Sequence, residues 1–176
     1  MCRIALLALV LVSTQIGCST AVKQAFYEVR GAKGEFVSQR GTRPATLDSY
    51  QSIQFRNAHS DIGGRIVPSH LLATYDAAAA ATQTQLSGSG NPVEVDTNIL
   101  YYEGKGLLGS AFLLAHIKMY GNGSVLDEGL IKVVSKSFRA GDPEDMATEA
   151  TETIAEYILG RSEGLFGDDD EDDDEN

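Results

Sequence analysis

Three consecutive segments of alternating apolar and polar residues restrict the fold of this chain more than any other feature. They span residues 92–103, 107–120 and 124–138. Alternation with a period of two predicts β-strands that direct one face at a core. The sequence Gly121-Asn122-Gly123 separates the last two segments, and these residue types tolerate the positive φ angles of a tight hairpin. The pattern therefore predicts an antiparallel meander of three strands.

Two helices are predicted on either side of the meander. Residues 69–86 follow Pro68, contain a run of five alanines and precede Gly88, which are signals of a helical start, interior and stop. Residues 142–159 begin with an Asp-Pro pair followed by two acids, so that a capping side chain and negative charge lie at the positive end of the helix dipole. Gly160 ends this second helix.

A further strand is predicted over residues 47–57, before the first helix. The expected fold class is therefore α+β, a two-layer sandwich in which two helices cover a mostly antiparallel sheet of about four strands, in the order β-α-β-β-β-α. The central strand carries apolar residues on both faces at its start. We expect Phe112 and Leu114 on this strand to lie beneath the helices.

The N-terminus has the three parts of a secretory signal. Arg3 and the amino group are positive, residues 4–12 are apolar, and residues 13–17 lead to Cys18. The apolar run is far shorter than the roughly 20 residues that a spanning helix needs. The pattern predicts a signal peptide over residues 1–17.

Gly17 directly before Cys18 resembles the lipobox of bacterial lipoproteins, although Gln15 and Ile16 depart from the leucine and small residue usual there. In that family the cysteine receives a diacylglycerol, with acyl chains such as palmitate, and the signal is removed just before it. The resemblance implies a lipidated Cys18. Ser19 is not the Asp that favours the inner membrane, so the resemblance implies an outer-membrane anchor facing the periplasm.

An ordinary cleavage site is the alternative at this position. The tripeptide Ser19-Thr20-Ala21 has the A-x-A-like pattern that would release a secreted soluble protein. Cysteine usage favours lipidation, because Cys2 leaves with the signal and a chain beginning at Cys18 has no second thiol with which to form a disulfide.

Charge is distributed unevenly along the chain. The formal net charge is −11, but residues 168–175 alone contribute eight of the 25 carboxylates. Such a like-charge run does not fold alone, so residues 161–176 are predicted to be a linker and a disordered acidic tail. Residues 18–46 are predicted to be the lipidated N-terminus with a tether or a small hairpin. Without residues 168–175, the rest of the chain has a net charge of only −3. It has no basic surface that would predict nucleic-acid binding, and residues 47–160 are predicted to form the α+β domain.

No motif predicts a catalytic residue, a metal or a cofactor. His59 lies with Ser60 and Asp61 in the loop after the first predicted strand. Its spacing matches no metal-ligand set, and the serine lacks the glycine-flanked turn of a nucleophile. An enzyme or a small-ligand-binding protein that uses His59 and Asp61 is therefore only the alternative function.

The remaining polar features favour structural roles. His70 is expected in an exposed first helical turn, and His116 on a solvated strand position. The glycines around Lys105 lack the spacing of a phosphate-binding loop, so a turn is predicted there. The acidic tail could attract Ca²⁺, but it lacks the alternating ligands and the glycine of a calcium loop.

The layout resembles several families of small envelope lipoproteins. It combines the lipobox-like start, the alanine-rich helix, a strand into Leu100-Tyr101-Tyr102-Glu103-Gly104, the Gly121-Asn122-Gly123 hairpin and a closing helix. Some of these families have a domain similar to the curli-export lipoprotein and to the N-terminal domain of the TolB periplasmic protein. Over residues 47–160, the resemblance implies a non-enzymatic module for binding or assembly of an envelope protein partner.

Overall fold

The computed structural model describes residues 31–161, apart from 87, 89, 105–109 and 137–140. The predicted signal peptide, Cys18 and the acidic tail lie outside the described residues. Within the described part, no helix is long and apolar enough to cross a membrane. The elements there are β1 (Ala32–Ser38), the 3-10 helix η1 (Ala45–Ser49), β2 (Ser52–Phe55), α2 (Ser69–Gln85), β3 (Pro92–Glu103), β4 (Ala111–Gly121), β5 (Ser124–Ser135) and α3 (Pro143–Leu159).

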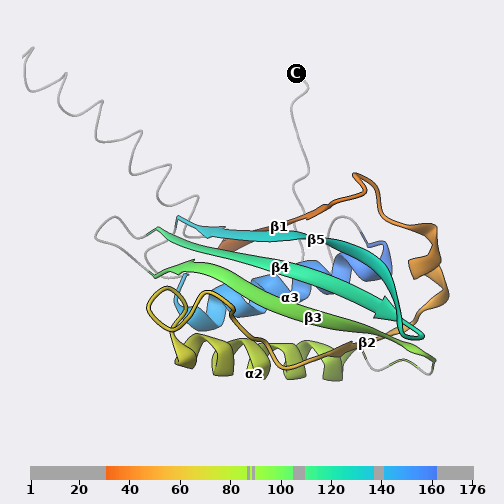
Figure 1. The fold of residues 1–176 in the computed structure, drawn as a ribbon, viewed down its shortest axis with the longest axis horizontal. Helices are drawn as coiled ribbons and strands as arrows, with labels where there is room; N and C mark the ends of the chain where they lie inside the picture. Colours follow the sequence, from red (N-terminus) through yellow and green to blue (C-terminus); the bar gives the residue numbers. More distant parts are fainter. Residues whose placement is uncertain (1–30, 87, 89, 105–109, 137–140, 162–176) are drawn as a thin grey trace, which may run out of the picture.

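The strands form one sheet in the order β1-β5-β4-β3-β2 (Figure 1). β3, β4 and β5 form the predicted antiparallel meander, and β1 adds antiparallel to β5. β2 pairs in parallel with β3, because α2 carries the chain back along the sheet between them. The α+β class is confirmed. The described sheet has five strands where about four were expected, and one of its pairings is parallel.

The segment predicted as the first strand, residues 47–57, forms two shorter elements. Its start belongs to η1, where Leu47 is buried, and only Ser52–Phe55 is extended. Ile53 is the one residue of β2 that is fully inside the core. With so little apolar alternation, the segment pairs over only four residues, at the edge of the sheet.

Ala32–Ser38, predicted to belong to a tether or a small hairpin, is the opposite edge strand. The ring of Phe36 packs on Tyr157 of α3, with centroids 4.4 Å apart. A Cβ added to Gly34 would lie 2.0 Å from Oγ1 of Thr153, so glycine lets α3 approach the strand closely at this point. The ordered sheet therefore begins before the expected domain boundary.

The local signals for the hairpin and the last helix are confirmed. Asn122 adopts a φ of 51° and Gly123 a φ of 78° in the turn between β4 and β5. At the start of α3, the Asp142 side chain accepts a hydrogen bond from the backbone of Asp145. Gly160 ends the helix in the left-handed conformation, with a φ of 65°.

Both helices cover the same face of the sheet, with α3 behind the strands in Figure 1 and α2 along the β2 edge. Side chains alternate along each strand, so only every second residue points toward the helices. Alanines on both helices let them pack closely, and the Thr82 and Thr151 hydroxyls form a buried hydrogen bond between them (2.9 Å). The larger buried residues are Val93, Val95, Ile99, Leu113, Ile117, Met119, Ile131, Val133, Leu71, Tyr75, Met146, Ile154 and Ile158.

The helices cover the face of β4 opposite to the one predicted. Leu113 is fully buried, whereas Phe112 and Leu114 are only partly buried on the other face. Both faces are apolar here, so alternation within β4 does not choose between them. The neighbouring strand does, because Leu114 lies opposite Lys132 and shares its face with a charged side chain.

A buried carboxylate joins three elements. Asp127 on β5 accepts hydrogen bonds from the Ser38 hydroxyl of β1 (2.9 Å) and from the Tyr157 hydroxyl of α3 (2.6 Å). Its third donor is the backbone N–H of Glu128. Burial and the bond to Asp127 raise the pKa of Tyr157 to about 12, so the phenol keeps the proton that it donates. This network holds β1 against β5 and α3.

Helix side chains also bind outward-facing backbone groups on both edge strands. A carboxylate oxygen of Glu149 accepts from the Gly34 N–H on β1 (2.6 Å), and burial raises the pKa of this carboxyl. On β2, the amide oxygen of Gln83 accepts from the Phe55 N–H (3.1 Å). Unpaired edges invite pairing with other chains, and these two contacts close part of each edge.

Candidate functional site

The sheet face opposite the helices has no described helix or strand over it, and it lies in front of α3 in Figure 1. Its residues are those that alternate with the buried ones and share their register across the strands. We call this surface the open face. It comprises Lys33, Glu35, Val37, Glu128, Leu130, Lys132, Val134, Phe112, Leu114, His116, Lys118, Tyr120, Glu94, Asp96, Asn98, Tyr101 and Glu103.

Two histidines far apart in the sequence lie in one row across the open face. His116 on β4 is the register partner of Asn98 on β3. His59, in the loop that follows β2 along the chain, pairs in parallel with the same asparagine. The His59 N–H donates to the Thr97 carbonyl (3.0 Å), and its carbonyl accepts from the Ile99 N–H (2.8 Å). The loop that carries His59 therefore continues the sheet and is held rigidly against β3.

Carboxylates accompany both histidines. Nε2 of His116 is hydrogen-bonded to Glu128 at 2.8 Å, and Nζ of Lys118 lies 3.8 Å from the same carboxylate oxygen. Nδ1 of His59 lies 3.8 Å from Oδ1 of Asp96. All of these side chains are partly exposed, so water screens the pairs and each contributes little to stability. The row is an accessible surface of mixed charge.

The loop after His59 is fixed by a two-bond clamp. The Asn98 amide donates to the Asp61 carboxylate (2.8 Å), while the Asp61 backbone N–H donates to the amide oxygen of Asn98 (3.2 Å). Asp61 is thus engaged with Asn98. Ser60 Oγ is buried and has no hydrogen-bond partner among the described residues. The described structure therefore shows no hydrogen bond between the His59 ring and the Ser60 hydroxyl.

Apolar side chains also lie on the open face, and two of them, Val37 and Leu130, continue the row that contains His116. Val37 is 56% exposed, Leu130 42% and Tyr101 41%. Tyr101 contacts the ring of Phe112, with centroids 6.0 Å apart. Leu114 lies between Tyr101 and Lys132 in the register. Apolar side chains of this size, beside ion pairs, form a surface on which a partner could gain free energy by excluding water.

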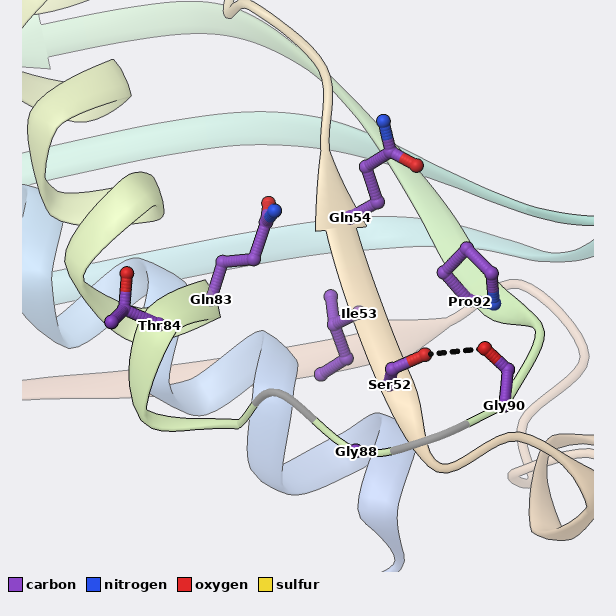
Figure 2. Close-up of a pocket in the computed structure, with 8 residues that line it drawn as sticks. All are labelled: Ser52, Ile53, Gln54, Gln83, Thr84, Gly88, Gly90 and Pro92. Carbon is purple, nitrogen blue, oxygen red and sulfur yellow. Dashed lines mark hydrogen bonds between the residues drawn. The ribbon is translucent and has the colours of Figure 1, made fainter.

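A shallow pocket of about 420 Å³ lies elsewhere, between β2 and the C-terminal end of α2 (Figure 2). The side chain of Gln83 extends from the helix toward the strand, and the Ser52 hydroxyl donates to the Gly90 carbonyl (3.2 Å). His59 and Asp61 do not line it. Its lining residues are uncharged: Ser52, Ile53, Gln54, Gln83, Thr84, Gly88, Gly90 and Pro92.

Sequence reasoning treated the histidines separately and missed their shared row. His70 lies exposed in the first turn of α2, as expected. His116 is on a partly exposed strand position, as expected, but its partner in the row was assigned to a loop. The parallel pairing of β2 with β3 creates the row, and no local pattern in the sequence indicates that pairing. Most of the loop around Lys105 lies outside the described residues.

Comparison with known proteins yields only distant similarity. No family model and no curated protein matches the sequence. Among solved structures, a single-substitution variant of PelC from Paraburkholderia phytofirmans, described as a dodecamer, has 10% identity and a TM-score of 0.46, covering 73% of this chain and 99% of that one. A second structure of the PelC dodecamer from the same organism has 10% identity, a TM-score of 0.44, and coverage of 74% and 99%. We infer nothing about function from these values. The predicted resemblance to the curli-export lipoprotein and TolB stays a prediction.

Proposed function

We propose that this chain is a non-enzymatic lipoprotein of the bacterial envelope, anchored in the outer membrane through Cys18. Its α+β domain binds a protein partner in the periplasm through the open face. The observation that carries the proposal is the contrast between the two faces of the sheet, one covered by helices and the other bearing large apolar side chains in water.

The composition of the open face suits a protein partner. Val37 and Leu130 are register neighbours and form an exposed apolar pair on β1 and β5. The Lys132–Glu35 ion pair lies beside them, and His116 is the register partner of Leu130 on the next strand. Non-obligate interfaces combine apolar contacts with a polar rim in this way. Burial of the apolar pair would contribute about 25 cal/mol for each Å² removed from water.

The alternative, an enzyme or small-ligand site at His59 and Asp61, has less support. The Asp61 carboxylate is hydrogen-bonded to the Asn98 amide, and the His59 side chain lies beside Asp96. Neither residue lines the pocket of Figure 2. Among the described residues, no group of three or more histidine, cysteine or acidic side chains is placed to hold a metal ion.

Replacing Cys18 with alanine should release the protein from the membrane fraction or leave an uncleaved precursor. Two or more acyl chains anchor a soluble domain stably, whereas one binds only marginally. Membrane fractionation, with intact mass of the wild-type protein, checks this prediction. A wild-type chain that begins at Val22 with no added lipid mass would contradict the anchor and leave a secreted domain.

A photo-crosslinking side chain placed at Leu130 should give one adduct of discrete mass in intact cells. The same group at Ala80, exposed on α2, should give none, because α2 lies on the far side of the domain from the open face. In the Leu130 background, Val37→Glu should remove most of the adduct by placing a charge in the apolar contact. Its melting temperature should stay close to that of the parent, because Val37 is 56% exposed.

Equal adducts at Leu130 and Ala80 would show that the open face is not a specific interface. An adduct at Leu130 that is unaffected by Val37→Glu would contradict the assignment of Val37 to the contact.

A further inference from the structure

We propose that residues 61–66, in the loop between β2 and α2, insert into the surface of the phospholipid bilayer that holds the lipid on Cys18. We call this segment the 61–66 turn. The inference rests on the lipid anchor proposed above and adds to it a second, shallow membrane contact. This contact fixes which end of the domain faces the bilayer and leaves the open face free for its protein partner.

Two large apolar side chains of the 61–66 turn lie in water. Ile62 is 47% exposed and Ile66 is 41% exposed. Every residue of the turn is exposed. A Cβ added to Gly63 or Gly64 would meet no atom of the described residues within 4 Å, apart from its chain neighbours. The turn therefore stands clear of the described domain, and its isoleucines can reach a surface outside it.

Hydrogen bonds and a buried side chain hold the turn at both of its ends. Asp61 forms two hydrogen bonds with Asn98 of β3. The Gly63 carbonyl accepts from the backbone N–H groups of Ile66 (3.2 Å) and Val67 (3.3 Å), and the Val67 side chain is 1% exposed in the core. The backbone is thus ordered before any contact is made, so little chain entropy is lost when the isoleucines are covered.

The turn lies at the end of the sheet where the chain enters from Cys18. Ala32, the first residue of β1, pairs with Ser135, which also pairs with the first residue of β4. The start of β4 lies opposite the end of β3. His59 runs parallel to β3 beside Asn98, so the chain continues toward this same end before α2 begins. In Figure 1 this end is on the left, with the loop that precedes α2.

The segment between the anchor and β1 is long enough to allow this contact. Residues 18–30 can span at most about 45 Å, at roughly 3.3–3.6 Å for each residue. Neighbouring strands are about 4.8 Å apart, so the opposite edges of the sheet are separated by about 20 Å. The anchored domain can therefore place the turn on the bilayer. Tethering raises the local concentration of the turn at the lipid surface, so even a weak contact is occupied.

Arg65 gives the turn a charge that suits phospholipid. It lies between the two isoleucines in the sequence, is exposed, and interacts with no other side chain among the described residues. A guanidinium binds phosphate through two parallel N–H bonds, while its aliphatic stem lies along apolar surface. Two isoleucines at the acyl boundary and one arginine at the depth of the phosphates match a bilayer surface, which requires no pocket on the protein.

A tryptophan can report the depth of the turn, because the chain contains none. The mature chain, residues 18–176, has Cys18 as its one cysteine, so this thiol can be coupled to a maleimide phospholipid in vesicles. The start of α3, with Asp142 and Glu144, lies near the same end of the sheet. The vesicles are therefore made of phosphatidylcholine and phosphatidylethanolamine, which have no net charge and do not repel these acids.

In the coupled Ile62→Trp variant, lipids brominated on their acyl chains should reduce the tryptophan fluorescence at least about twofold, because the indole lies at the acyl boundary. Val125→Trp is the matched control. Val125 is also 47% exposed, but it lies beside the β4–β5 hairpin at the opposite end of the sheet. Its fluorescence should fall by less than about a tenth, because the indole stays in water.

Two further substitutions in the Ile62→Trp background test the chemistry of the contact. Arg65→Glu and Ile66→Asp each place a carboxylate at the lipid surface, where it would lose hydration. Each should reduce the quenching by at least about half. Both positions are exposed, so the melting temperatures should stay close to that of the parent.

Equal quenching of the two tryptophan variants, no quenching of either, or quenching that both carboxylate substitutions leave unchanged would overturn the proposal. A protein photo-adduct at Ile62 in cells, without quenching in vesicles, would assign the turn to a protein partner instead. Coupling through the thiol does not depend on lipidation in the cell. Failure of this test is therefore distinct from failure of the Cys18 anchor, which membrane fractionation reports.

Discussion

Replacing Asp127 with alanine is expected to lower the free energy of unfolding by about 2–5 kcal/mol. The carboxylate is fully buried and accepts hydrogen bonds from the hydroxyl groups of Ser38 and Tyr157. Its removal leaves these two donors without an acceptor, and each buried unsatisfied group costs about 1–3 kcal/mol. Urea denaturation followed by circular dichroism measures the change.

Two controls sharpen this prediction. Asp127→Asn keeps one acceptor oxygen and should lose less stability than the alanine variant. Asp48→Ala breaks the ion pair between Asp48 and Arg43. The Asp48 side chain is 67% exposed, so this change should cost less than about 1 kcal/mol of stability. A loss below about 1 kcal/mol for Asp127→Ala would show that the hydroxyl groups find other partners.

Adjacent leucines on β4 provide the second large effect. Leu113→Ala should cost about 2–5 kcal/mol, because Leu113 is fully buried between the sheet and the helices. Leu114→Ala should cost only about 1 kcal/mol, since its side chain lies partly in water on the open face. Thermal unfolding of both variants measures the difference. Equal losses, or a larger loss at Leu114, would show that the helices cover the other face of the sheet.

The elements with complete local signals could be predicted closely. α3 has a capping aspartate, a proline in its first turn and Gly160 at its end, and its observed bounds follow these signals. The turn between β4 and β5 likewise has Asn122 and Gly123 at the two positions whose positive φ angles these residue types tolerate. Such features depend on a few neighbouring residues, so the sequence specifies them without knowledge of the rest of the fold.

The features that could not be predicted depend on contacts with residues far away in the sequence. Ala32–Ser38 has only brief apolar content, and its place at the sheet edge depends on β5 and on the close approach of α3 at Gly34. The covered face of β4 depends on Lys132 of the neighbouring strand. The histidine row depends on the parallel pairing of the segment after β2. In each case, the deciding contact lies far away in the sequence.

The pairing of β1 with β5 also determines the order in which the sheet can be completed. Residues 124–135 and the helix that follows them are synthesised long after residues 32–38, so β1 has no partner until almost the whole domain has emerged. β3, β4 and β5 are sequence neighbours and close with little loss of chain entropy. The meander is therefore the part of the sheet that can form early in folding. Among the strand pairings, that of β1 with β5 closes the longest loop, so we expect β1 to join the sheet last. This pairing then sets the length of chain that must be present before the native state is reached.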